Sequence, residues 1–76
     1  MFSIGMAIRI ERVRRRWSQQ DLADRVGLSV AQIGRIERDD RKVLADELGS
    51  FAAAFDMTPA DLLDVAKEEG ERAAQG

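Results

Sequence analysis

The sequence predicts an all-α domain of five short helices. Three segments repeat one helix-start pattern, in which an apolar residue and then Ser or Thr are followed, three residues after the hydroxyl, by Asp or Gln and a second apolar residue. The hydroxyl of such a pattern accepts from the backbone N–H three residues on, and the two apolar side chains pack together as a hydrophobic staple. Apolar residues elsewhere recur at helical spacings, and the alternation typical of strands does not occur.

The first helix is expected to begin after Ser3, an N-cap residue type, and to run to about Arg16. Ile4, Ile8 and Val13 are expected to face inward. The three consecutive arginines at its end have two interpretations: contact with an anionic partner, or a solvated helix end that complements the negative end of the helix dipole. The second interpretation is favoured.

The second and third helices are expected to lie close together, joined by a tight turn. The second begins at Ser18, where Trp17 and Leu22 form the staple, so Trp17 is assigned to the core. It ends near Gly27, because glycine is favoured in the left-handed conformation that follows many helices. The start pattern then repeats eleven residues later and predicts a third helix over residues 29–38.

Two further helices are expected in the second half of the chain. An amphipathic helix over residues 44–55 is predicted by four apolar residues at spacings of four, three and four, namely Leu44, Leu48, Phe51 and Phe55. The start pattern occurs a third time around Thr58, now with Pro59 at the first helical position. This fifth helix is expected to fade near Gly70 into a polar tail, residues 71–76.

The composition is that of one small domain. With 76 residues, 45% of them hydrophobic, the chain can build a single modest core, expected within residues 1–70, and dimerisation would add stability. Because the chain contains no Cys and no His, disulfides and the usual soft metal sites are excluded, and no cofactor is expected. No apolar run reaches the ~20 residues that span a bilayer, and no signal-peptide pattern occurs, so we expect a soluble, cytoplasmic protein without a membrane partner.

Charge is distributed unevenly along the chain. Residues 1–42 contain ten Lys or Arg and six Asp or Glu, a net charge of +4, whereas residues 43–76 contain two and eight, a net charge of −6. Such asymmetry suggests that the first half faces an anionic partner, although solvated helix faces are the simpler explanation for charged runs in general. The acidic pairs are adjacent residues without a nucleophile or base beside them, so we expect no enzymatic activity.

Two segments, IRIERVRRRWSQQDLADRVGLSVAQIGRIERDDRK and LGSFAAAFDMTPADLL, resemble the helix-turn-helix family of the phage Cro and repressor proteins, also called the XRE family. The similarity extends over about residues 4–66. It implies a compact, lambda-repressor-like domain of five helices, with the helix-turn-helix formed by the second and third, and double-stranded DNA as the partner. The sequence departs from the family at Asp39 and Val43, where Gly and Pro are common, so the loop over residues 39–43 differs from the family pattern.

The resemblance also assigns roles to side chains of the helix-turn-helix. The third helix would enter the major groove, which admits one α-helix. Side chains similar to the base readers of the family are Ser29, Val30, Ala31, Gln32 and Arg35. Side chains placed to hold DNA phosphates are Gln19, Arg38, Arg41 and Lys42. Gly34 either allows a close approach of the helix to DNA or to a neighbour, or is an ordinary surface glycine.

A structural ion pair is implied between Arg12 of the first helix and Glu37 of the third. Apolar residues left over around the fifth helix predict a two-fold dimer interface, unless all of them fit inside the core; they are Leu63, Val65, Phe55 and Met57.

Together these features predict a sequence-specific DNA-binding transcriptional regulator, a repressor or an autoregulatory controller, that binds a palindromic operator as a homodimer through residues 29–38. The alternative is a protein-interaction module, antitoxin-like or accessory, that keeps the fold without binding specific DNA. It is motivated by the apolar Val30 and Ala31 and by the acidic second half of the chain.

Overall fold

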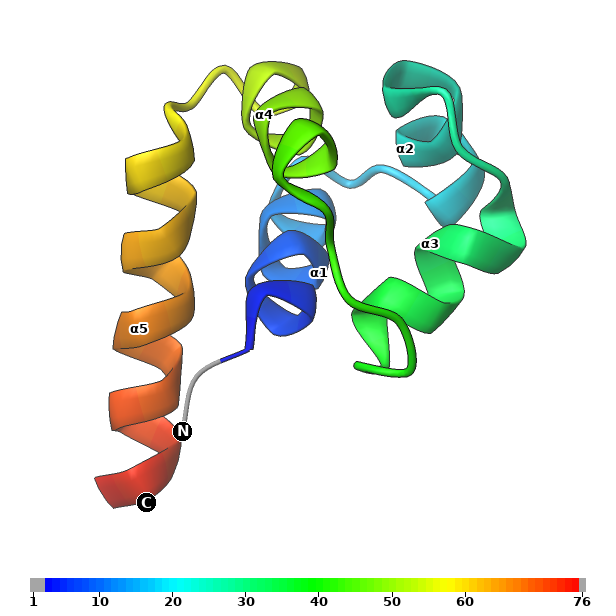
Figure 1. The fold of residues 1–76 in the computed structure, drawn as a ribbon. Coiled ribbons are helices and arrows are strands. Elements are labelled where there is room, and N and C mark those ends of the chain that lie inside the picture. The colour runs from blue at the N-terminus through cyan, green and yellow to red at the C-terminus, as the bar shows by residue number, and fades with distance from the viewer. Residues whose placement is uncertain (1–2, 76) are drawn as a thin grey trace.

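The computed structural model describes residues 3–75, with side chains described for residues 3–72. Its helices are α1 (Ile4–Arg14), α2 (Gln19–Val26), α3 (Val30–Glu37), α4 (Ala45–Ala54) and α5 (Pro59–Gln75). Figure 1 shows α1 between α5 on one side and the α2–α3 pair on the other, and α4 contacts both α5 and α2. The prediction of an all-α domain with five helices is confirmed, and the described residues form no strand.

The repeated start patterns form reciprocal caps at the starts of α2, α3 and α5. At α2, the Ser18 hydroxyl accepts from the Asp21 N–H at 3.0 Å, and the Asp21 carboxylate accepts from the Ser18 N–H at 2.8 Å. Hydrogen bonds from Ser18, first of all from its backbone N–H, hold the pKa of Asp21 below its ordinary value. The same pair of bonds joins Ser29 to Gln32 at α3 and Thr58 to Asp61 at α5.

A residue in the left-handed conformation follows one or two positions after the end of each of the helices α1 to α4. After α2 this residue is Gly27, with φ 74°, whereas Arg16, Asp39 and Asp56 follow the other three with φ of 59°, 61° and 58°. The N–H groups of these residues bond back to the last helical turn, which satisfies carbonyls that would otherwise lack partners. Because Arg16 takes this conformation, α1 ends at Arg14, two residues before its expected end.

Apolar side chains from all five helices form the core. Its fully buried members are Ala7, Ile8, Leu22, Ala23, Ile33, Ile36, Phe51, Ala52, Phe55, Leu62 and Ala66. Trp17 packs at the edge of this core and stacks on Phe55, with ring centroids 5.8 Å apart, so its assignment to the core is confirmed. The inward orientation expected of Val13 is wrong: the residue is 55% exposed, because five residues after Ile8 an α-helix has turned to nearly its opposite side.

Gly5 lies where α1 approaches α3 closely. A Cβ atom at this buried position would overlap the carbonyl oxygen of Ile36 and would lie 2.9 Å from the Asp39 carboxylate. A residue without a side chain is therefore required for the two helices to pack as they do. The Ser3 hydroxyl donates to Asp39 Oδ1 at 2.7 Å, which ties the start of α1 to the end of α3.

Helix α5 is longer than the sequence predicts. It continues through the buried Gly70 to Gln75, so residues 71–75 of the expected polar tail are helical, and residue 76 lies outside the described part. Glu69 and Arg72 form an ion pair three residues apart, and the Glu- and Ala-rich segment favours a helix strongly enough to outweigh one glycine. None of the helices in residues 3–75 combines the length and the hydropathy needed to cross a bilayer.

Candidate nucleic-acid interface

The exposed face of α3 carries the predicted base-reading residues. Ile33 and Ile36 are buried in the core, which leaves the other side of this helix to solvent. The structure exposes Ser29, Val30, Ala31 and Arg35 and half-buries Gln32. All five lie at the N-terminal end of α3 or one turn later, which is the arrangement that a helix entering a groove with its N-terminal end requires.

Gln32 also forms part of the cap at the start of α3. Its Oε1 accepts from the Ser29 N–H at 2.9 Å, and the Ser29 hydroxyl accepts from the Gln32 N–H at 3.1 Å. A glutamine that reads adenine bidentately uses its amide oxygen as an acceptor and its amide nitrogen as a donor. The cap uses one lone pair of this oxygen and orients the amide, so Gln32 keeps Nε2 as a donor and one lone pair of Oε1 as an acceptor for a base edge.

A hydrogen-bond network beneath this face joins α1, α2 and α3. Arg12 donates from Nε and Nη2 to the two carboxylate oxygens of Glu37, at 2.7 and 3.0 Å, and from Nη1 to the Trp17 carbonyl at 2.8 Å. The Arg12 and Glu37 side chains are 13% and 4% exposed, so the ion pair is nearly buried as well as bidentate. Gln19, an expected phosphate contact at the start of α2, also donates to Glu37 Oε1, at 3.1 Å. The network thus orients the Gln19 amide and leaves it one N–H for another acceptor.

Gly34 lies on the side of α3 that faces the start of α2. It is buried, so the interpretation as an ordinary surface glycine is wrong. A Cβ atom there would lie 3.4 Å from Arg38 Nη1 and 4.0 Å from Gln19 Nε2, which are ordinary contacts with the ends of flexible side chains. The neighbours that approach Gly34 are therefore two of the expected phosphate contacts, within the same chain.

The three cations that follow α3 are held in different ways. Arg38 pairs with Asp40 at 3.3 Å, but both side chains are mostly exposed, so this pair adds little stability. Lys42 is exposed. Arg41 donates to both carboxylate oxygens of Glu47, at 2.9 and 2.7 Å, and this hydrogen-bonded pair raises the pKa of Arg41 and lowers that of Glu47. The phosphate contact expected of Arg41 therefore has a competitor within the chain.

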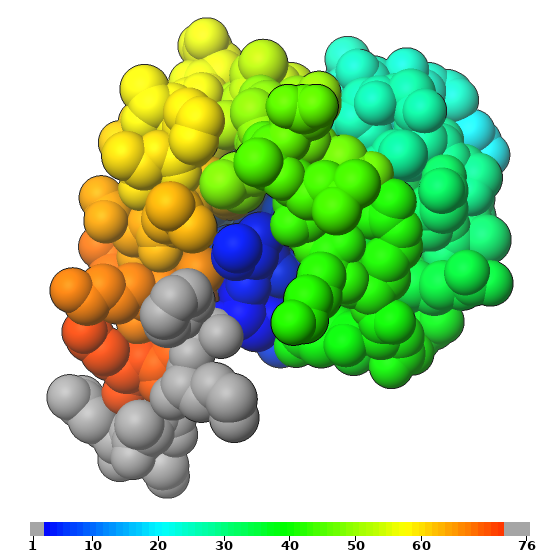
Figure 2. All heavy atoms as spheres, in the orientation of Figure 1, coloured from blue at the N-terminus to red at the C-terminus, as the bar shows by residue number. Residues whose placement is uncertain are grey.

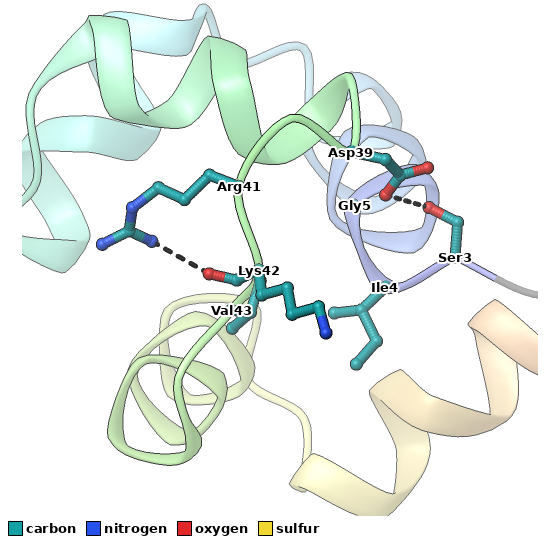
Figure 3. Close-up of a pocket in the computed structure, with 7 residues that line it drawn as sticks. All are labelled: Ser3, Ile4, Gly5, Asp39, Arg41, Lys42 and Val43. Carbon is teal, nitrogen blue, oxygen red and sulfur yellow. Dashed lines mark hydrogen bonds between the residues drawn. The ribbon is translucent and has the colours of Figure 1, made fainter.

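A pocket of about 570 Å³ opens beside the loop that follows α3. Figure 2 shows the start of α1 recessed between this loop and α5. Its lining residues are Ser3, Ile4, Gly5, Asp39, Arg41, Lys42 and Val43. In Figure 3, Lys42 extends across the pocket toward Ile4, and the Arg41 guanidinium points away from Ser3 and Asp39. Asp39 has φ 61°, a conformation that glycine adopts more readily, which accounts for the glycine common at this position in the family.

Two arginines pack on aromatic rings at the edge of the core. Arg15 donates to the Phe55 carbonyl at 2.6 Å, and its guanidinium lies 5.8 Å from the ring centroid of Trp17 and 4.9 Å from that of Phe55. The Arg25 guanidinium lies 4.0 Å from the Trp17 centroid. Such cation–π contacts contribute about 0.5–1 kcal/mol at exposed sites and more where they are desolvated. Arg15 also donates to the Glu11 carbonyl at 2.9 Å, so it bonds the end of α1 as that interpretation expects, but its side chain is packed on the aromatic rings and not solvated.

The four apolar residues assigned to a dimer interface lie in different environments. Phe55 is 1% exposed, and its assignment is wrong, because its ring is enclosed in the core of the monomer and presents no surface to a partner. Met57 and Val65 are half-buried and pack against the core. Leu63 is 37% exposed on α5.

Comparisons with known proteins agree with this geometry. The clp gene regulator ClgR from Corynebacterium glutamicum is 27% identical, with a TM-score of 0.86 over 95% of this chain and 78% of that one. The restriction-modification controller protein C.AhdI from Aeromonas hydrophila is 32% identical, with a TM-score of 0.74 over 78% of this chain and 89% of that one. The P22 c2 repressor, solved in complex with synthetic operator 9T, is 26% identical, with a TM-score of 0.74 over 82% of this chain and 94% of that one.

A search of the curated proteins gives no match. The helix-turn-helix family matches residues 8–62, which is more than half of the chain and includes α2, the turn and α3. The fold, the exposed face of α3 and this match agree, and the chain therefore belongs to the helix-turn-helix family, as a member of the Cro and repressor type.

Proposed function

We propose that this helix-turn-helix transcriptional regulator binds a palindromic operator as a homodimer, with α3 in the major groove and α2 across the DNA backbone. The observation that carries the proposal is the setting of α3: its N-terminal face is exposed, while Glu37 at its other end is tied to Arg12 and Gln19. The similarity to a repressor solved with operator DNA supports it. Dimers of this motif read half-sites about 34 Å apart, which is why a two-fold protein implies an approximately palindromic site.

Arg35 is expected to read a base. It lies three and four residues from Gln32 and Ala31, and its planar fork can donate two hydrogen bonds to a guanine edge. Arg35→Ala should lose about 1–3 kcal/mol of binding free energy on the operator and little on random-sequence DNA, and it should relax specificity at one symmetric base pair of each half-site. Fluorescence anisotropy with both DNAs at several salt concentrations measures this difference.

Lys42→Ala is the matched variant, because Lys42 lies beyond α3 and is expected to contact only the DNA backbone. It should weaken binding to both DNAs alike and should reduce the slope of log affinity against log salt by about one unit per contact, or twice that in a dimer. Equal losses on the two DNAs for Arg35→Ala would remove Arg35 from the base readers.

The homodimer is expected to use Leu63, which is 37% exposed on α5, the helix that also carries the half-buried Val65. Leu63→Glu should yield monomers with poor operator affinity, because a buried carboxylate opposes association. Arg72→Glu introduces the same charge at an exposed position nine residues later, on the side of α5 opposite Leu63, and should leave the dimer intact. Sedimentation velocity measures both; wild-type protein that stays monomeric at concentrations that saturate the operator would contradict the model.

A second candidate function is a protein-interaction module that keeps the fold. The exposed Val30 and Ala31 favour it, because they place apolar surface where a base reader more often carries a polar group. The two functions differ in salt dependence: DNA binding releases counterions and weakens steeply with added salt, whereas binding through an apolar face need not. A gel shift on the DNA upstream of the protein's own gene, run at two salt concentrations, separates them.

A further inference from the structure

Arg41 is already bound by a carboxylate in the free protein. Its Nη1 and Nη2 donate to Oε1 and Oε2 of Glu47 at 2.9 and 2.7 Å, and Nη1 also donates to the Lys42 carbonyl at 3.3 Å, the bond drawn in Figure 3. A bidentate pair of this kind uses the same planar fork with which arginine binds a phosphate. A DNA phosphate and Glu47 would therefore compete for one guanidinium.

Glu47 is itself held in place by the backbone. Its Oε1 accepts from the Leu44 N–H at 3.0 Å, which caps the start of α4, where the N-cap residue has no side-chain acceptor of its own. Turning the carboxylate away from Arg41 would give up this bond as well. The hydrogen bonds from Arg41 and then from Leu44 lower the pKa of Glu47, so the carboxylate is ionised at neutral pH.

The neighbouring cations are not restrained in this way. The contact of Arg38 with Asp40 joins two side chains that are 66% and 63% exposed, and water and salt weaken such a pair. Lys42 is exposed and extends over the pocket (Figure 3). The side chains of Arg41 and Glu47, by contrast, are 25% and 16% exposed. A phosphate that binds Arg41 through its Nη1–Nη2 fork must displace a partly buried carboxylate, and one that approaches the Nε–H side meets a guanidinium whose charge Glu47 already neutralises. Arg38 and Lys42 are accessible without such an exchange.

We propose that Glu47 is a specificity-determining residue, which occupies the Arg41 guanidinium in place of a DNA phosphate and thereby lowers the affinity of the protein for DNA of any sequence. The inference rests on the proposed DNA-binding function. Phosphate contacts supply essentially all of non-specific binding, whereas contacts with base edges carry the sequence information. When Arg41 makes no phosphate contact, the contacts of the exposed face of α3 with base edges supply a larger share of the binding free energy.

Glu47→Gln is the first variant of the test. The glutamine amide oxygen can still accept from the Leu44 N–H, so α4 keeps its cap, but the neutral amide offers Arg41 at most one weaker bond. On random-sequence duplex DNA the variant should bind about fivefold to tenfold more tightly per protomer at ~0.1 M salt, the gain for one added phosphate contact. The slope of log affinity against log salt should become steeper by about 0.9 per protomer.

Two further variants isolate the role of Arg41. Asp46→Asn removes the same charge from the adjacent, exposed position and should change the affinity by less than about twofold, because solvent and salt screen it. Arg41→Ala combined with Glu47→Gln should abolish the gain, because the freed guanidinium is then absent. An equal gain for Asp46→Asn, or a gain of Glu47→Gln that persists when Arg41→Ala is added, would overturn the proposal.

A measurement without DNA separates this inference from the proposed function. The Arg41 Nη–H signal of ¹⁵N-labelled protein, which reports the donors that Glu47 holds, is followed by NMR while inorganic phosphate is added, and it should move in Glu47→Gln but not in the wild type. If no variant binds duplex DNA and phosphate still moves the signal only in Glu47→Gln, the masking of Arg41 stands and the proposed function falls. If phosphate moves the signal equally in both proteins, the masking is overturned whatever the DNA result.

Discussion

The Glu37→Ala variant is expected to be about 3–5 kcal/mol less stable than the wild type, the typical loss when one member of a buried ion pair is removed. The substitution leaves the Arg12 guanidinium nearly buried without its bidentate partner, and it removes the acceptor of the Gln19 amide. In a domain of this size, such a loss lowers the melting temperature by on the order of 15 °C or more. Thermal unfolding followed by circular dichroism measures the change.

The control replaces both partners of the pair. Arg12→Met combined with Glu37→Leu leaves no unpaired charge in the interior and should recover part of the stability lost in Glu37→Ala. The recovery is incomplete, because the Trp17 carbonyl and the Gln19 amide each lose a hydrogen bond. An unchanged melting temperature for Glu37→Ala, together with altered DNA specificity, would reverse the assignment and make Glu37 a base reader.

The Gly5→Ala variant is expected to lose about 3 kcal/mol of stability, the upper end of the usual range for overpacking, although alanine is the better helix former. The added Cβ atom would overlap the Ile36 carbonyl oxygen, a backbone atom that cannot rotate away, so α1 must move relative to α3. That movement also disturbs the hydrogen bond from Ser3 to Asp39. Urea unfolding followed by Trp17 fluorescence measures the loss.

Gly49→Ala is the matched control for this variant. Gly49 lies within α4, and nothing lies within 4 Å of the position that its Cβ atom would take. Here alanine should stabilise the domain by about 1 kcal/mol, the difference in helix propensity between the two residues. Opposite effects of one substitution at two glycines would identify the contact with Ile36 as the cause, whereas equal stabilisation would mean that α1 and α3 separate freely.

The helices could be predicted because their starts are encoded locally. Ser18 and Asp21 lie three residues apart, so the cap that they form depends on nothing else in the chain, and the same holds at the starts of α3 and α5. The helix ends are harder to predict, because the left-handed residues after α1, α3 and α4 are Arg16, Asp39 and Asp56 rather than glycine.

In the candidate site, too, features set by neighbouring residues could be predicted, whereas contacts between separate segments could not. The exposed face of α3 follows from helical spacing alone. The features that the sequence does not reveal depend on which distant atoms occupy the neighbouring space, and they include Gly5 against Ile36, Arg15 on the Phe55 ring, and Arg41 with Glu47. The spacing of Phe51 and Phe55 shows that both lie on one side of a helix, but it does not show what covers Phe55. The ring is covered by Trp17 of the same chain and not by a second copy of the protein, which is why its assignment to a dimer interface was wrong.

The cap at the start of α3 restricts substitution at some exposed positions of this helix more than at others. A change at Ser29 or Gln32 alters a proposed base-reading side chain and the helix start together, and loss of an N-cap residue destabilises a helix by about 0.5–2 kcal/mol. Val30, Ala31 and Arg35 are exposed and take no part in the cap. New operator preferences among descendants of this sequence should therefore arise first at these three positions, while the two capping residues stay unchanged.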